Sequence, residues 1–136
     1  MVEADGYILR ISTKRWVDQV FNLAMYYTGA RRRWKLGQTI ILMHRTSFGD
    51  AVIGYGVIGD IYERDELSEE ERRECEKYGW KKAIAFRYII RFENPLPIKE
   101  TFLKGLKLRG KYLHSLPLNK EQLDAIISQA EDLQHQ

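Results

Sequence analysis

Cysteine is almost absent from this chain of 136 residues, and proline is scarce. The single cysteine, Cys75, excludes an intrachain disulfide framework and a zinc site built from several cysteines. A chain of this length buries roughly two-thirds of its unfolded surface when it folds, so a stable core needs neither kind of cross-link. We therefore predict a single domain that spans residues 1–136.

Long hydrophobic runs are also missing. No apolar stretch approaches the roughly 20 residues that a membrane-spanning helix needs. The first residues lack the charged-then-apolar profile of a signal peptide. Together with the lone cysteine, these absences predict a cytoplasmic protein with no membrane partner.

The short motifs of common cofactor and nucleophile sites do not occur either. We find no nucleophile elbow, phosphate-binding loop or dinucleotide fingerprint. Gly54 and Gly56 lie inside a predicted strand rather than ahead of a helix, and the three histidines have no metal-ligand spacing. We therefore expect no cofactor and no metal.

Charge is distributed unevenly along the chain, although the formal net charge is only +3. Residues 63–77 carry eight acidic and four basic side chains, and residues 119–136 carry four acidic and one basic. The rest of the chain has 17 lysines and arginines against 7 acidic side chains. This polarity favours a polyanionic partner for one face, although a small charge-rich domain can also segregate charge by chance.

Alternation of side-chain character predicts the strands, and helical spacing with capping residues predicts the helices. Strands are expected at residues 7–11, 39–45, 52–63 and 83–92, with shorter ones at 106–108 and 111–113. Helices are expected from Thr13 to Gly29, after Ser68 and after Asn119. Residues 94–97 should end the fourth strand. Three glycines within residues 52–63 indicate a sharply bent strand.

Three segments carry a family resemblance. Residues 34–42 lead into the second strand, residues 51–58 form a glycine-containing strand, and residues 106–118 form a closing segment. In this order they resemble the PUA-like superfamily, within it the EVE-type domains, and most of all an uncharacterised archaeal PUA-like family. The resemblance implies an α+β fold: a PUA-like curved sheet or open pseudo-barrel of about five to six strands with two to three packed helices.

The resemblance also implies a pocket beside the sheet for a flipped, unpaired or modified base. Such a pocket needs aromatic faces for stacking and polar groups that read the base edge. Family phrases that supply these polar groups are replaced here at residues 12–16 and 26–33, so the candidates come from the sequence itself. Trp16, on a helical stripe, is expected in the core. The base-pocket candidates are Tyr27, Trp34, His44, Arg45, Thr46, Tyr112, His114 and Ser115.

Clusters of basic residues are the candidates for phosphate contacts, since guanidinium groups form paired hydrogen bonds with phosphate oxygens. These candidates are Arg31, Arg32, Arg33, Lys35, Lys107, Arg109 and Lys111. Together with the implied pocket they favour a non-catalytic nucleic-acid-binding module, with RNA preferred to DNA.

Two alternatives remain open at this point. Some PUA-like relatives are small amidohydrolases of acylated nucleosides such as N4-acetylcytidine, which use a threonine, a lysine and a glutamate. Here Thr13 and Lys14, with Glu63 or Glu93, have those residue types. The other alternative is a protein-interaction domain whose surface is the acidic helix at residues 68–77.

Overall fold

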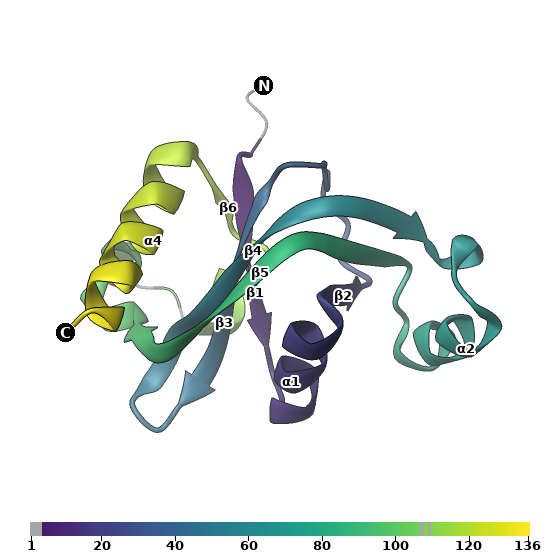
Figure 1. Cartoon of the computed structure of the whole chain (residues 1–136), viewed down its shortest axis with the longest axis horizontal. Helices are drawn as coiled ribbons and strands as arrows, with labels where there is room; N and C mark the ends of the chain where they lie inside the picture. Colours follow the sequence, from purple (N-terminus) through teal and green to yellow (C-terminus); the bar gives the residue numbers. More distant parts are fainter. Residues whose placement is uncertain (1–3, 107, 109) are drawn as a thin grey trace.

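A curved, open sheet forms the centre of the molecule (Figure 1). The computed structural model describes residues 4–106, 108 and 110–136. The sheet has six strands in the order β2-β5-β4-β3-β1-β6, and β1 and β3 are parallel while the other neighbours are antiparallel. The strands are β1 (Gly6–Ile11), β2 (Met25–Thr28), β3 (Thr39–Thr46), β4 (Gly49–Glu63), β5 (Lys82–Pro97) and β6 (Pro117–Leu118).

Helices cover the sheet on both faces, and one further helix lies beyond one end of it (Figure 1). The helices are α1 (Lys14–Leu23), α2 (Glu69–Tyr78), α3 (Gly110–Leu113) and α4 (Lys120–Gln134), and the 3-10 turns are η1 (Arg64–Glu66), η2 (Ile98–Glu100) and η3 (Phe102–Leu106). The predicted α+β class with a curved sheet is confirmed. None of the helices in the described part of the chain has the length and apolar character to span a bilayer.

The alternation of side chains along β3 divides the core in two. Ile41 and Met43 point to one face, where α4 packs, while Ile40 and Leu42 point to the other, where α1 packs. All four side chains are fully buried. Successive residues of a strand face opposite sides of the sheet, so a strand covered on both faces is apolar at every position.

The bends of β4 depend on glycine. The register between β4 and β5 shifts beside Gly54 and around Ile58. A Cβ atom at Gly54 would overlap the carbonyl oxygen of Ile90 and lie 2.8 Å from Cζ of Phe21. At Gly56 a Cβ atom would lie 2.7 Å from the ring of Phe86. These glycines therefore serve the close packing of β5 and α1 against β4.

The first helix is shorter than predicted. It ends at Leu23, and Ala24 has a left-handed backbone with φ 52°. Met25–Thr28 then pairs with β5 as an edge strand, and the Ala24 carbonyl accepts a hydrogen bond from Phe86 N–H over 2.8 Å. The predicted helix to Gly29 is therefore wrong. Residues 25–28 also fit a helical spacing, but they form hydrogen bonds with the edge of β5 instead.

The closing part of the chain also differs from the prediction. Strand β5 does not stop before residues 94–97, because Leu96 and Pro97 pair with β4 beyond a bulge. Residues 111–113 belong to α3 rather than to a strand, and Pro117–Leu118 pairs with β1 instead. Residue 107 of the other expected short strand lies outside the described residues. The end of β5 and the position of β6 thus depend on pairing with strands that are distant in the sequence.

We predict that Gly54→Ala lowers the free energy of unfolding by about 2 kcal/mol, because a backbone carbonyl cannot move aside as a flexible side chain does. Chemical denaturation followed by circular dichroism measures this change. Gly105→Ala is the matched control: no atom lies within 4 Å of its added Cβ, so its effect should stay within about 0.5 kcal/mol. Equal stability of the two variants would contradict the packing argument.

Candidate functional site

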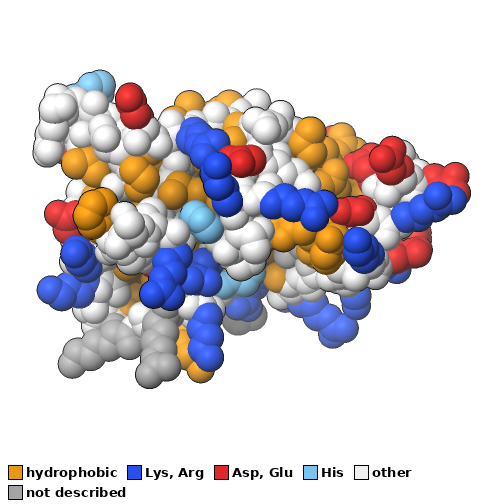
Figure 2. Space-filling model, turned by 90° about the horizontal axis from the view of Figure 1, so that it is seen from below, with side chains coloured by type: hydrophobic (Ala, Val, Ile, Leu, Met, Phe, Trp, Pro, Cys, Tyr) orange, Lys and Arg blue, Asp and Glu red, His pale blue; other side chains and the backbone are white. Residues whose placement is uncertain are grey.

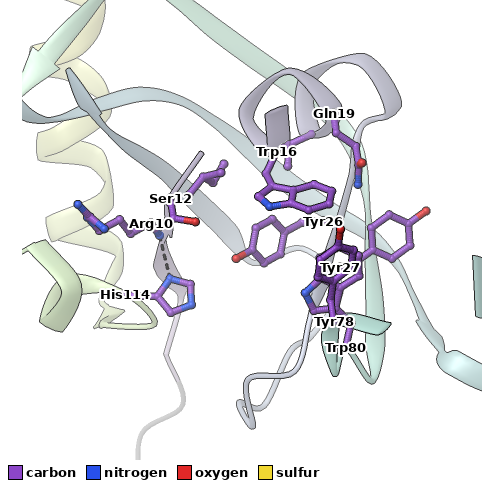
Figure 3. Close-up of a pocket in the computed structure, with 11 residues that line it drawn as sticks. Arg10, Ser12, Trp16, Gln19, Tyr26, Tyr27, Tyr78, Trp80 and His114 are labelled. Atoms are coloured by element: carbon purple, nitrogen blue, oxygen red, sulfur yellow. Dashed lines mark hydrogen bonds between the residues drawn. The ribbon is translucent and has the colours of Figure 1, made fainter. Parts of the chain in front are cut away.

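A pocket with a volume of about 310 Å³ opens at the carboxyl end of β1 (Figure 3). Five segments that are far apart in the sequence converge on it: the end of β1, α1, β2, the junction of α2 with β5, and the turn after α3. We call it the aromatic pocket. Its lining residues are Arg10, Ile11, Ser12, Trp16, Gln19, Val20, Tyr26, Tyr27, Tyr78, Trp80 and His114.

Four aromatic rings support one another along one side of the pocket (Figure 3). Trp80 stacks on Tyr78, with ring centroids 4.8 Å apart, and on Tyr27 at 5.5 Å. Trp16 meets Tyr78 and Trp80 edge-on at 5.1 and 5.2 Å. Such pairs contribute roughly 0.5–1.5 kcal/mol each beyond burial. The rings are therefore held in position before any ligand arrives.

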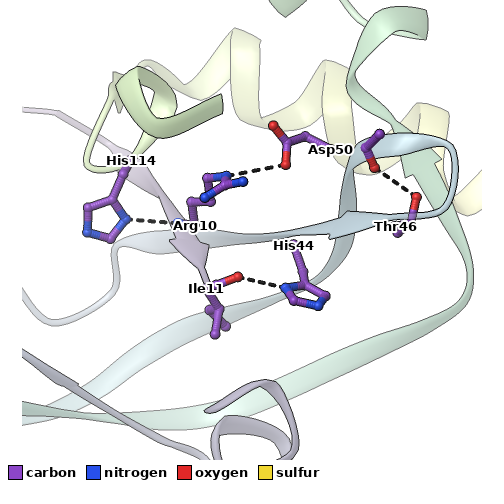
Figure 4. Close-up of polar contacts among 7 residues, drawn as sticks. Arg10, Ile11, His44, Thr46, Asp50 and His114 are labelled. Atoms are coloured by element: carbon purple, nitrogen blue, oxygen red, sulfur yellow. Dashed lines mark hydrogen bonds and ion pairs between the residues drawn. The ribbon is translucent and has the colours of Figure 1, made fainter. Parts of the chain in front are cut away.

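The opposite end of the pocket is polar. The main-chain N–H of Arg10 donates a hydrogen bond to Nδ1 of His114 over 2.9 Å, and Nε of Arg10 pairs with Asp50 at 3.2 Å (Figure 4). Burial lowers the pKa of His114, and the nearby positive charges of Arg10 and Arg32 lower it further. His114 is therefore neutral at pH 7.

The two tyrosines of β2 are held as neutral phenols. Burial raises the pKa of Tyr26 to about 12. Burial also raises the pKa of Tyr27, as does the hydrogen bond that its hydroxyl donates to Oε2 of Glu71 over 2.8 Å. The same bond is the main cause that lowers the pKa of Glu71. It ties α2 to β2 and so positions the aromatic side of the pocket.

Three exposed arginines follow β2. Arg31, Arg32 and Arg33 line a shallow hollow of about 350 Å³ together with Lys81 and Lys82, and we call it the basic hollow. Arg32 lies close enough to the aromatic pocket to lower the pKa of His114. Figure 2 shows lysine and arginine side chains spread over one face of the molecule between hydrophobic ones, with acidic side chains gathered at the α2 end.

Only Tyr27 and His114 of the predicted base-pocket residues line the aromatic pocket. His44, Arg45 and Thr46 line a separate hollow of about 560 Å³. Nδ1 of His44 lies 2.7 Å from the carbonyl oxygen of Ile11 (Figure 4). The sequence analysis placed all of these residues in one base pocket, but the structure places His44, Arg45 and Thr46 apart from Tyr27 and His114.

The remaining three base-pocket candidates lie elsewhere. Trp34 is buried in the core, where its ring meets Tyr7 edge-on at 5.0 Å, so its faces are covered. Tyr112 lies exposed on α3 with the ammonium group of Lys111 5.0 Å from its ring centre. Ser115 is buried with φ 65°, and its hydroxyl has no hydrogen-bond partner among the described residues.

The predicted phosphate contacts are brought together only in part. Arg31, Arg32 and Arg33 share the basic hollow. Lys35 lies in the turn before β3, where its main-chain N–H donates a hydrogen bond to Oε1 of Gln38 over 2.8 Å. Lys107 and Arg109 lie outside the described residues. Lys111 lies on α3, which follows them.

The four residues of the amidohydrolase alternative do not converge on the aromatic pocket. Oγ1 of Thr13 caps α1 by accepting a hydrogen bond from Trp16 N–H. Glu63 ends β4 and pairs with Lys82 at 3.4 Å. Lys14 and Glu93 line the hollow that contains His44.

Sequence reasoning missed much of the aromatic pocket. Trp16 fits a helical stripe and was expected in the core, yet its ring reaches the pocket. Tyr78 and Trp80 flank Gly79, whose φ of 74° ends α2. Two aromatic residues around a helix-ending glycine are the one local signal that could have identified this junction.

Comparison with solved structures identifies the fold. No family profile and no curated protein matches the sequence. Among solved structures, an ASCH protein from Zymomonas mobilis aligns over 89% of this chain and 92% of its own, with a TM-score of 0.65 and 13% identity. The N-terminal domain of McrB from Staphylothermus marinus aligns over 94% and 98%, with a TM-score of 0.50 and 12% identity. The chain has the PUA-like fold.

A third alignment covers nearly all of both chains. A hypothetical protein from Leishmania major aligns over 95% of this chain and 97% of its own, with a TM-score of 0.60 and 16% identity. The resemblance that three sequence segments carry is thus confirmed for the fold. The EVE-type and archaeal assignments stay predictions.

We predict that Tyr27→Phe raises the pKa of Glu71, because it removes the main hydrogen bond to the charged carboxylate. A carboxyl-carbon NMR titration measures this shift. Tyr88→Phe, which changes an exposed tyrosine, should leave Glu71 unaffected.

The same bond makes stability depend on pH. The pKa of Glu71 is lower in the folded state, so its stabilising contribution is present above the unfolded-state pKa and is lost as the pH falls through the folded-state pKa. The difference in free energy of unfolding between the wild-type protein and Tyr27→Phe should therefore shrink on acidification. A difference that stays constant with pH would contradict this account.

Proposed function

We propose that this chain is a non-catalytic module that binds single-stranded nucleic acid, with RNA preferred, and holds one unpaired or flipped base in the aromatic pocket. One observation carries the proposal: the aromatic pocket, whose rings hold one another in place, lies beside the exposed arginines of the basic hollow. The PUA-like fold supports it, since the family resemblance in the sequence implies a base pocket beside the sheet.

Stacking supplies the first part of the interaction. Tyr78 lies at the surface with an exposed fraction of 38%, and its ring stacks on Trp80 and meets Trp16 edge-on. Stacking of a base on such a ring contributes roughly 1–3 kcal/mol and tolerates any base, since every base has a flat π-face. The ring contacts fix the platform, so little conformational entropy is lost on binding.

Phosphate contacts supply the second part. Arg31, Arg32 and Arg33 are exposed, and within the described ranges 4–106, 108 and 110–136 no ion pair involves them. Their guanidinium groups are thus available for the paired hydrogen bonds that phosphate oxygens accept. A strand whose base enters the aromatic pocket would run its backbone along the basic hollow.

We predict that replacing Arg31, Arg32 and Arg33 together by alanine reduces the salt dependence of binding. Each lost phosphate contact lowers the slope of log K against log salt concentration by about 0.7 for a single strand, so the triple variant should lose about 2. Fluorescence anisotropy with labelled single-stranded RNA, single-stranded DNA and duplex RNA at about 50 mM and about 200 mM salt measures this slope.

The matched control replaces Arg72 and Arg73 on the acidic helix α2 by alanine, and its slope should equal that of the wild-type protein. Nuclease-treated protein is needed, so that bound cellular nucleic acid does not mask the site. The proposal is overturned if the wild-type protein binds none of the three probes, or if its binding does not change with salt.

We predict that Tyr78→Ala weakens single-stranded RNA binding by roughly ten- to hundredfold at both salt concentrations, because stacking involves no counterion release. Phe48→Ala is the control. Phe48 is 78% exposed at the tip of the β3–β4 hairpin and lies outside the aromatic pocket. If both variants bind as the wild-type protein does, the aromatic pocket does not receive the base.

A further inference from the structure

Among the described residues that line it, the polar end of the aromatic pocket offers hydrogen-bond donors and no carboxylate. We propose that this end reads position C4 of a pyrimidine or C6 of a purine, and that it selects a carbonyl oxygen there, as in uracil and guanine, over an amino group, as in cytosine and adenine. This inference rests on the proposed function and adds the class of base. It follows from the protonation of the groups that line the pocket.

A main-chain hydrogen bond sets the tautomer of His114. The N–H of Arg10 can only donate, so Nδ1 of His114 must carry a lone pair. A neutral imidazole with a lone pair on Nδ1 has its proton on Nε2. In Figure 3 the ring edge with Nε2 faces the aromatic side of the pocket. His114 therefore presents an N–H donor to a bound base.

The other histidine beside β1 has the opposite tautomer. Nδ1 of His44 faces the carbonyl oxygen of Ile11, which can only accept, so Nδ1 carries the proton. His44 belongs to the separate hollow. The imidazole that lines the aromatic pocket is therefore the one whose Nδ1 accepts and whose Nε2 donates.

The neighbours of His114 do not oppose the preference. The guanidinium of Arg10 points away from the aromatic rings, and its Nε pairs with Asp50 (Figure 3). Tyr26 stays a neutral phenol because burial raises its pKa to about 12, and its hydroxyl points toward His114 across the pocket (Figure 3). The hydroxyls of Tyr26 and Ser12 can donate or accept, so they adapt to the base that the His114 donor selects.

An amino group at this end would face the fixed N–H donor of His114. Cytosine N4 and adenine N6 are donors, whereas uracil O4 and guanine O6 are acceptors. Two donors face to face leave both groups without a partner in a partly buried site. Gln19 is the one lining side chain with an amide acceptor, and it lies on α1 on the far side of the rings from His114 (Figure 3).

The test measures the binding of seven-residue RNA probes in which one central base is flanked by abasic residues. The four probes carry uracil, cytosine, guanine or adenine, so each pair differs at the edge that the pocket is expected to read. We expect uracil to bind about tenfold more tightly than cytosine, and guanine about tenfold more tightly than adenine.

Two variants connect this ratio to the pocket. His114→Leu should bring the uracil-to-cytosine ratio close to one, and Tyr88→Phe, which removes a hydroxyl from an exposed ring outside the pocket, should leave it unchanged. Because His114→Leu also removes the acceptor for Arg10 N–H, its thermal unfolding must be compared with that of the wild-type protein. Nitrogen NMR of the wild-type ring gives a second readout: the Nε2 proton of His114 should shift when the uracil probe binds.

The outcomes separate this inference from the proposed function. Equal or tighter binding of cytosine and adenine, with binding still dependent on Tyr78, overturns the base selection and leaves the proposed function standing. A His114 ring that carries its proton on Nδ1 also overturns it. If none of the four probes binds, both the inference and the proposed function fail.

Discussion

The burial of the parallel pair β1 and β3 on both faces is the constraint on which the rest of the molecule depends. Ile40 to Met43 are inaccessible to solvent, and so are Ile8 and Leu9 beside them. A pair that is apolar on both sides needs a layer on each side, and α1 and α4 supply these layers. Because α1 follows β1 directly, the carboxyl end of β1 becomes the place where helix, sheet and closing turn meet. The aromatic pocket lies there.

The pocket combines a rigid aromatic side with a polar end whose protonation is set by the backbone. Stacked and edge-on contacts hold Trp80 and Trp16, and the bond from Tyr27 to Glu71 ties in the α2 end. On the other side, Arg10 contributes its main-chain N–H to His114 and its guanidinium to Asp50. The two sides come from opposite edges of the sheet, since β2 and β6 are its outermost strands. The curvature of the sheet brings these edges toward one another.

Local sequence signals predicted some features well and others poorly. The helix after Asn119 was predicted, and Asn119 and Gln122 form both reciprocal bonds of its cap, because a cap depends on residues three apart. The end of the first helix was not predicted, because Ala24 and Tyr27 fit both a helix and an edge strand. Trp34 looked like a site residue beside three arginines, yet its ring fills the core against Tyr7. The charge of the neighbouring arginines does not determine whether the Trp34 ring points into the core or toward the surface.

The sequence by itself determined the four main strands, the second and last helices and the basic character of residues 31–33. These features depend on side-chain periodicity, capping and composition, all of which are local. Tertiary structure alone decided which aromatic residues share a pocket, which histidine joins them and which nitrogen of that histidine carries the proton. The reason is physical: the pocket assembles from residues 10–27, 78–80 and 114, and their proximity depends on strand order and sheet curvature rather than on any spacing along the chain.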